Sequence, residues 1–120
     1  MLIIDGQSLS MVLSSQSLEQ KFFSVSKDAP SVCICRCSPT QKAIVAAKIK
    51  QYTSKRIACV GDGGNDVAMI QVGDVGIGIV GKEGMQASLA ADFSIEKFKA
   101  LTHLILWHGR LSYKRSAILA

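Results

Sequence analysis

Two aspartates lie four residues apart in a glycine-rich turn, and an asparagine stands between them. The stretch 61–66 reads G-D-G-G-N-D. The largely apolar run 56–60 precedes it, and the helix-compatible segment 66–70 follows it. A buried strand that ends in such a turn delivers acidic side chains to the carboxyl edge of an α/β sheet, where ligands usually bind. Because Mg²⁺ prefers a few carboxylate oxygens together with retained water, the pattern predicts a magnesium–phosphate site.

Each polar side chain of this acidic turn has a chemical role open to it. Asp62 follows the strand directly, so its carboxylate is predicted to contact Mg²⁺. Asn65 is predicted to donate a hydrogen bond to a phosphoryl oxygen. Asp66 is predicted either to bind a water molecule that is coordinated to the metal or to hold a lysine. The alternative is an ordinary turn at 62–65, followed by an acid in the first turn of a helix.

Two cations earlier in the chain are candidates for the same site. Lys42 is near the start of an expected helix, and its ammonium would offset negative charge on a transferring phosphoryl group. Arg36 ends the expected strand before that helix. Its guanidinium either faces the same anionic ligand or forms a salt bridge at the strand end. The alternative for Lys42 is a solvated surface position.

Two other glycine patterns resemble phosphate loops and are rejected. Residues 76–81 match G-x-G-x-x-G, but their middle is β-branched and apolar, so they are expected to form a strand rather than the loop that opens a helix. The same stretch nearly matches a P-loop through Gly81 and Lys82. However, Glu83 stands where a Ser or Thr must hold Mg²⁺, and an acid there would repel nucleotide phosphates.

Apolar runs alternate with helix-compatible segments along the chain. Strands are expected at 2–4, 31–36, 57–60, 75–80 and 92–95, and helices at 8–27 with a break near 14–15, at 39–52, at 83–89 and from 98 onward. The helix at 39–52 has a well-formed start, with Ser38 as N-cap, Pro39 at the first position and Gln41 three residues after the cap. Such alternation implies βαβ units and a mainly parallel sheet.

Composition limits the classes of protein to consider. The chain has 120 residues, of which 48% are hydrophobic and 19% charged, which suits one packed domain or a piece of one. Only 6% are aromatic, and four of the five net positive charges lie from residue 96 onward, so nucleic acid is not the expected partner. No signal peptide is visible, and no apolar run approaches the roughly 18–20 residues of a membrane span. The chain as given is expected to be soluble or peripheral.

The cysteines indicate a reducing setting. Cys33, Cys35 and Cys37 alternate, so in a strand they would share one face. Three thiols in a row are poorly shaped for a metal, and a free cysteine is more often a small buried hydrophobe. Neither a zinc knuckle nor a secreted disulfide framework has this spacing, which favours the cytosol.

Four ordered motifs together resemble the phosphorylation domain of P-type ATPases. In chain order they are R-C-S-P-T-Q-K at 36–42, G-D-G-G-N-D at 61–66, G-M-Q-A at 84–87 and H-G-R at 108–110. Their residues and spacing are most similar to those of the type IV branch, the phospholipid flippases. Gly64 stands where many members have alanine, and some flippases, including an endosome- and Golgi-associated class, use glycine there.

The resemblance implies a Rossmann-like α/β fold of the haloacid-dehalogenase type, incomplete in this chain. In that family a D-K-T-G aspartate on a different strand accepts the γ-phosphoryl group of ATP, and Mg²⁺ assists. Asp62 and Asp66 match metal-site positions. Arg36, Lys42, Asn65 and Asp66 match positions near the nucleotide and its phosphates, with Lys42 as the catalytic cation. The chain has no D-K-T-G.

The resemblance also implies how the chain is divided and what its parent protein does. Residues 1–97 correspond to the C-terminal part of the phosphorylation domain, and 98–120 to a stalk helix leading toward a membrane span. The parent would use ATP to move phospholipid at the cytosolic face of a membrane, of the Golgi or endosome class, with a possible accessory subunit. The fragment alone is expected to be inactive. Two alternatives stay open: a stand-alone binding or regulatory module, and a soluble phosphatase of the same fold.

Overall fold

The computed structural model describes residues 1–81 and 85–108. Strands and helices alternate along them, as the sequence predicts. The elements are β1 (Leu2–Asp5), α1 (Gly6–Leu13), α2 (Gln16–Asp28), β2 (Val32–Cys35), α3 (Pro39–Thr53), β3 (Ala58–Gly61), the 3₁₀ turn η1 (Gly64–Asp66), α4 (Val67–Val72), β4 (Val75–Ile79), α5 (Gln86–Ala90), β5 (Phe93–Ile95), α6 (Ala100–His103) and the π-helical turn η2 (Leu104–His108).

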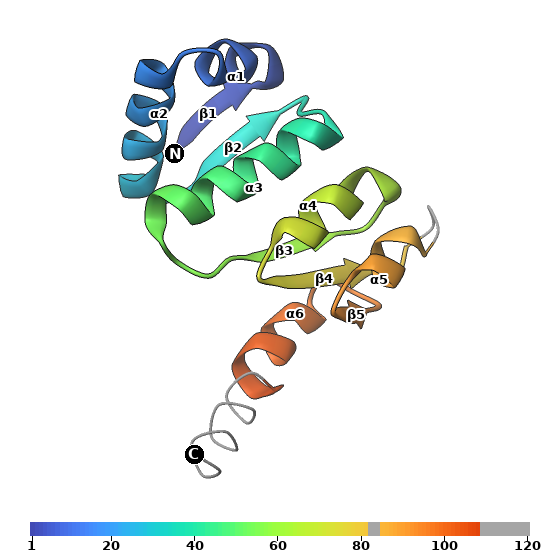
Figure 1. Ribbon diagram of the computed structural model, residues 1–120. Helices are drawn as coiled ribbons and strands as arrows, with labels where there is room; N and C mark the ends of the chain where they lie inside the picture. The colour runs from blue at the N-terminus through green and yellow to red at the C-terminus, as the bar shows by residue number, and fades with distance from the viewer. Residues whose placement is uncertain (82–84, 109–120) are drawn as a thin grey trace.

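The strands form two parallel sheets rather than one. β1 pairs with β2, and β3 pairs with β4, which pairs with β5. Within the described residues β2 and β3 share no ladder, and α3 and α4 pack against each other across the interval between the sheets (Figure 1). The predicted class, an incomplete Rossmann-like parallel sheet, is therefore confirmed.

One face of the three-stranded sheet packs closely against helices because it carries glycine. A Cβ on Gly76 would lie 2.6 Å from Cγ2 of Ile70, and one on Gly78 would lie 2.5 Å from the Cα of Ser88. Both glycines lie inside β4. They are packing positions of a strand, so the G-x-G-x-x-G match is not a phosphate loop, as expected. Part of the P-loop match, residues 82–84, lies outside the described residues.

The start of α3 forms as predicted, and it is tied to α1. The Ser38 hydroxyl accepts a hydrogen bond from the Gln41 backbone N–H at 3.2 Å, and the Gln41 side chain accepts one from the Ser38 N–H at 3.0 Å. The Gln41 amide also donates to the Gly6 carbonyl at 2.7 Å. This capping box fixes the first turn of α3, and with it Lys42.

A polar and aromatic cluster joins α2 to the other side of α3. Glu19 is 8% exposed, and its carboxylate lies 2.9 Å from the Lys48 ammonium. The Tyr52 hydroxyl donates to the same carboxylate at 3.3 Å, and the Tyr52 ring stacks on Phe23 at 4.9 Å between centroids. The buried charge is therefore paired and hydrogen-bonded, as burial of an ionised group requires.

The first helices and the C-terminal helix can be compared with the bounds predicted from the sequence. The helix predicted at 8–27 is broken at Ser14 and Ser15 into α1 and α2, as expected. The long helix expected from residue 98 begins at Ala100 and continues as the π-helical turn η2 to His108. Residues 109–120 of the predicted stalk, with most of the H-G-R motif, lie outside the described residues. None of the helices described is long and apolar enough to cross a membrane.

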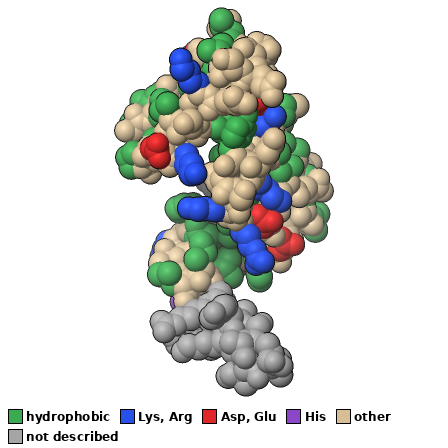
Figure 2. Space-filling view, turned by 60° about the vertical axis from the view of Figure 1, so that its left-hand side comes forward, with side chains coloured by type: hydrophobic (Ala, Val, Ile, Leu, Met, Phe, Trp, Pro, Cys, Tyr) green, Lys and Arg blue, Asp and Glu red, His purple; other side chains and the backbone are tan. Residues whose placement is uncertain are grey.

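Apolar side chains also remain on the surface. Ile3 is 60% exposed, Phe93 49% and Phe98 64%. On the face drawn in Figure 2, hydrophobic side chains are visible between those of lysine and arginine. The core is correspondingly small, and its largest fully buried side chains are those of Leu9, Ile70 and Ile77.

Candidate functional site

An ion pair joins two of the predicted site residues. Nζ of Lys42, in the first turn of α3, lies 2.7 Å from Oδ1 of Asp66, at the end of η1. The Lys42 side chain is 27% exposed and the Asp66 side chain 9%. A short contact between a nearly buried carboxylate and an ammonium is a strong, charge-assisted hydrogen bond. The structure therefore brings together two residues that are 24 positions apart in the sequence.

The second oxygen of Asp66 holds the acidic turn itself. Oδ2 accepts a hydrogen bond from the backbone N–H of Asp62 at 3.2 Å. The side chain lies so close to Gly61 that a Cβ there would overlap the Cβ of Asp66. Asp66 thus closes the loop from the end of β3 to η1. Of the two roles that the sequence left open for Asp66, holding a lysine is the one that the geometry displays.

Asp62 and Asn65 are the exposed polar side chains of the turn. Both are exposed, Asp62 directly after β3 and Asn65 within η1. Their side chains are accessible to a ligand, whereas the Asp66 carboxylate is engaged from two directions. Among the residues described, no group of three or more His, Cys, Asp or Glu could hold a metal ion. A cation at this turn would therefore depend mainly on Asp62 and on ligands from elsewhere.

Arg36 lies at the end of the other sheet. It is exposed, and it adopts a left-handed backbone conformation with φ of 54° directly after β2. Its charge acts on Asp5, the last residue of the neighbouring strand β1. The backbone N–H of Ser8 lowers the pKa of Asp5 most strongly, and Arg36 lowers it further. The structure therefore places Arg36 near Asp5. The cation that forms an ion pair with the acidic turn is Lys42.

A largely apolar groove of about 490 Å³ lies where the sheet is interrupted. Its lining comes from β2, α3, β3 and α4, and it includes Ile34, Val45, Ile49, Val60 and Met69. Lys42 and Asp66 are the charged residues of this lining. Cys37 also lines the groove, and burial raises the pKa of its thiol. The sequence shows the apolar residues, but only the separation of β2 from β3 makes them a groove.

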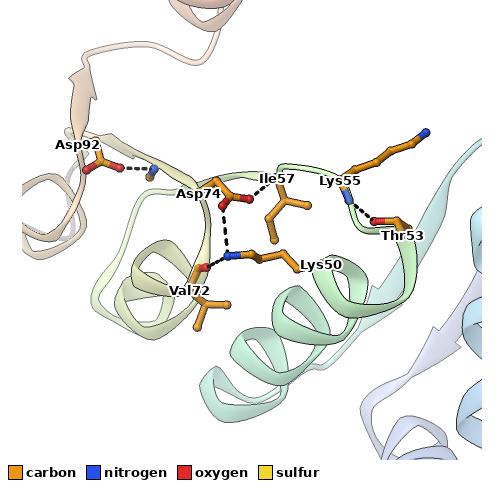
Figure 3. Close-up of polar contacts among 8 residues, drawn as sticks. Lys50, Thr53, Lys55, Ile57, Val72, Asp74 and Asp92 are labelled. Carbon is orange, nitrogen blue, oxygen red and sulfur yellow. Dashed lines mark hydrogen bonds and ion pairs between the residues drawn. The ribbon is translucent and has the colours of Figure 1, made fainter.

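A second network positions β3 relative to α3. The Lys50 ammonium lies 3.2 Å from the Asp74 carboxylate, whose other oxygen accepts a hydrogen bond from the Ile57 N–H at 2.9 Å (Figure 3). The bond from Ile57, followed by Lys50, holds the pKa of Asp74 below its usual range. Asp92 likewise accepts a hydrogen bond from the Gly76 N–H at 2.8 Å. Sequence reasoning missed these contacts because they cross between elements that are distant in the chain.

Comparison with known proteins agrees with the motifs. The profile of a family described as "Phospholipid-translocating P-type ATPase C-terminal" matches residues 88–120. The chain is 64% identical over 119 residues to the phospholipid-transporting ATPase NEO1 of Saccharomyces cerevisiae, covering 99% of this chain. It corresponds to a segment of a type IV P-type ATPase. It is also 53% identical over 118 residues to the probable phospholipid-transporting ATPase IIB of Homo sapiens, covering 98% of this chain.

The match covers a small part of each relative. The chain spans about 10% of the length of these phospholipid-transporting ATPases. The predicted identity, a segment of a phospholipid-translocating P-type ATPase, is thereby confirmed. The identity extends over nearly the whole chain, so the acidic turn, α3 and the described part of the C-terminal region all lie inside it.

Proposed function

We propose that this chain is the Mg²⁺- and phosphate-binding half of a phosphorylation domain in an ATP-driven phospholipid flippase. The observation that carries the proposal is the Lys42–Asp66 ion pair of 2.7 Å. It joins Lys42, the last residue of the R-C-S-P-T-Q-K motif, to Asp66, the last residue of the G-D-G-G-N-D turn. The two motifs that resemble the ATPase family therefore meet at one place, as a shared site requires.

The residues at the turn fit a hard cation. Asp62 offers an exposed carboxylate at the end of a parallel strand, and Mg²⁺ is commonly held by one or two carboxylates with several waters. Bound there, Mg²⁺ would neutralise charge on phosphate oxygens. Asp62 would contact the cation, and Asp66 would orient Lys42 and the turn. Asn65, exposed beside them, would donate a hydrogen bond to phosphate.

In this proposal Lys42 supplies a positive charge from the protein to the phosphate, in addition to that of Mg²⁺. Its ammonium has three donors, of which Asp66 takes one at 2.7 Å, so others remain for a phosphoryl oxygen. Asp66 holds the side chain in place before a ligand arrives, which lowers the entropy lost on binding. Arg36, directly after β2, would contribute a second positive charge near the ATP phosphates.

The groove between β2 and β3 is proposed to receive the strand that carries the phosphorylated aspartate. Both bordering strands are parallel, each pairs on one side only within the described residues, and the lining is largely apolar. A central strand of a parallel sheet is buried on both faces and needs such surroundings. The sequence has no D-K-T-G of its own. The acceptor aspartate would come from another part of the parent protein.

The wider assignments rest on the same family. Residues 1–97 are proposed to belong to the phosphorylation domain and 98–120 to a stalk leading toward a membrane span. The parent would bind ATP and phospholipid at the cytosolic face of a membrane of the Golgi or endosome class, with an accessory subunit as a further partner. The open groove supports a second candidate, a binding module that takes up a strand from a partner.

Phosphoenzyme formation in the parent protein tests the proposal. With labelled ATP and Mg²⁺, Asp62→Asn is expected to lower acid-stable phosphorylation at least about tenfold, and Lys42→Ala is expected to lower it similarly. Lys21→Ala, on the exposed surface of α2, is the matched control and is expected to leave it unchanged. Phosphorylation at the level of the unmodified protein in both site variants would refute the assignment. The 120-residue chain alone is expected to release no more phosphate from ATP than its Asp62→Asn variant.

A further inference from the structure

Two exposed thiols lie side by side on β2, away from the acidic turn. The Sγ atoms of Cys33 and Cys35 are 3.9 Å apart, and both residues are exposed. Ile34, between them, is half-buried and lines the groove, so the two cysteines point to the opposite face of the strand. The pair is therefore separate from the site built by Lys42 and Asp66.

The sheet face that carries the pair is open. In the parallel register Cys33 lies opposite Ile3 and Cys35 opposite Asp5, so these four residues share a face. Ile3 is 60% exposed and Asp5 is also exposed, whereas Leu2 and Ile4, on the other face, are half-buried. The two sulfur atoms are accordingly accessible to a solute in this chain.

The sulfur separation matches that of two thiolates on one metal ion. Zinc binds thiolate sulfur at about 2.3 Å with tetrahedral angles, which places two such sulfurs about 3.8 Å apart. The observed separation is 3.9 Å. A disulfide would need about 2.05 Å between the sulfurs and Cα atoms no more than about 6.8 Å apart. Two residues along a strand span about 6.6 Å, near that limit, so chelation fits the existing backbone better than a disulfide.

Cys37, the third of the alternating cysteines, is not part of the pair. Arg36 turns the backbone into the left-handed region at φ of 54°, so the alternation ends with β2 at Cys35. The Cys37 thiol lines the groove instead, and Cys59 is buried. The three-thiol arrangement considered from the sequence is thus absent from the described structure. The protein supplies two sulfur ligands here, and the other coordination positions are open.

We propose that Cys33 and Cys35 form a two-thiolate site for a soft, thiophilic divalent cation of the Zn²⁺ class. Soft thiolate ligands select such ions over Mg²⁺. On binding, both S–H bonds break, two metal–sulfur bonds form and two protons leave to solvent, while water fills the remaining positions.

Titration of the reduced 120-residue chain with Cd²⁺ tests the site. The ultraviolet charge-transfer absorption of the cadmium–thiolate bond reports binding, and Zn²⁺ is added as a competitor. One equivalent of Cd²⁺ is expected to bind and to be displaced by Zn²⁺. Cys33→Ser and Cys35→Ser are each expected to weaken binding at least about tenfold, because each removes one of two ligands. Cys37→Ser, the matched control, is expected to bind like the unmodified chain.

Alkylation of the unmodified chain gives an independent measurement that does not depend on how the variants fold. Cd²⁺ is expected to protect Cys33 and Cys35 together from iodoacetamide and to leave Cys37 as reactive as before, as mass spectrometry of the peptides would show. The proposal is overturned if the reduced chain binds no Cd²⁺, if the Cys33→Ser and Cys35→Ser variants bind as tightly as the unmodified chain, or if protection falls on Cys37. Mg²⁺ is expected neither to protect nor to compete.

Discussion

Replacement of Lys42 by methionine removes the charge that pairs with Asp66 while keeping most of the apolar stem. The Asp66 side chain is 9% exposed, and it would keep only its hydrogen bond from the Asp62 N–H at 3.2 Å. An ionised carboxylate in a low-dielectric setting with one neutral donor is poorly compensated. The folded chain should therefore lose stability, and the acidic turn should lose its fixed geometry.

The expected cost lies between two limits. Removing one partner of a fully buried ion pair costs about 3–5 kcal/mol, whereas exposed pairs contribute only about 0.2–1 kcal/mol. Asp66 is close to the buried limit, but Lys42 is 27% exposed, and water would solvate the vacated position in part. We therefore expect Lys42→Met to lower the free energy of unfolding by about 2 kcal/mol.

Urea unfolding of the 120-residue chain measures this change. With a slope of about 1–3 kcal/mol per molar urea, the midpoint should fall by about 1 M. A double-mutant cycle with Asp66→Asn should give a coupling free energy of at least about 1 kcal/mol, since the two side chains are in contact. Lys21→Met, on the exposed surface of α2, should leave the midpoint unchanged. A coupling free energy near zero would refute the view that this pair fixes the turn.

Three further predictions concern the backbone and the pH dependence. Gly61→Ala should lower the free energy of unfolding in urea by more than about 2 kcal/mol, because a Cβ at this position would overlap Asp66. Gly64→Ala should lower it by less than about 1 kcal/mol, because the added Cβ would meet only the end of the flexible Gln86 side chain. A cost for Gly64→Ala equal to that for Gly61→Ala would contradict this. Ser38→Ala should cost about 1 kcal/mol through loss of the α3 cap, and unchanged helicity and urea midpoint would contradict it. The pKa of Asp74 is lowered in the folded chain, so its stabilisation is present above the unfolded-state pKa and is lost as pH falls through the lowered value. Urea midpoints of Asp74→Asn should accordingly fall less steeply with acid than those of the unmodified chain, and parallel curves would argue against this role.

Local chemistry explains what could be predicted in advance. The start of α3 was predictable because the residues of a capping box are only three positions apart. The strand β4 was predictable because the β-branched residues Val75, Ile77 and Ile79 alternate with its two glycines. Both signals lie within one element, so they do not depend on how the sheets assemble.

Contacts across the fold could not be predicted in this way. The sequence predicted that Lys42 and Asp66 belong to one site. Only the packing of α3 on α4 brings Nζ of Lys42 to 2.7 Å from Oδ1 of Asp66. Arg36 was predicted for the same site, and the structure shows that its charge acts on Asp5 at the end of β1. The left-handed backbone conformation of Arg36 ends the alternation of the cysteines and leaves Cys33 and Cys35 as a pair.

The sequence by itself therefore determined the order of the elements, the parallel class of the sheet and the family, because these depend on local patterns and on motifs. The tertiary structure alone decided which nominated residues touch, where the sheet is interrupted and which face of β2 is open. The physical reason is that side-chain contacts between distant segments depend on how helices and strands pack, which no local spacing encodes. The acidic turn is closed by Asp66 and reached by Lys42 because α3 and α4 lie against each other.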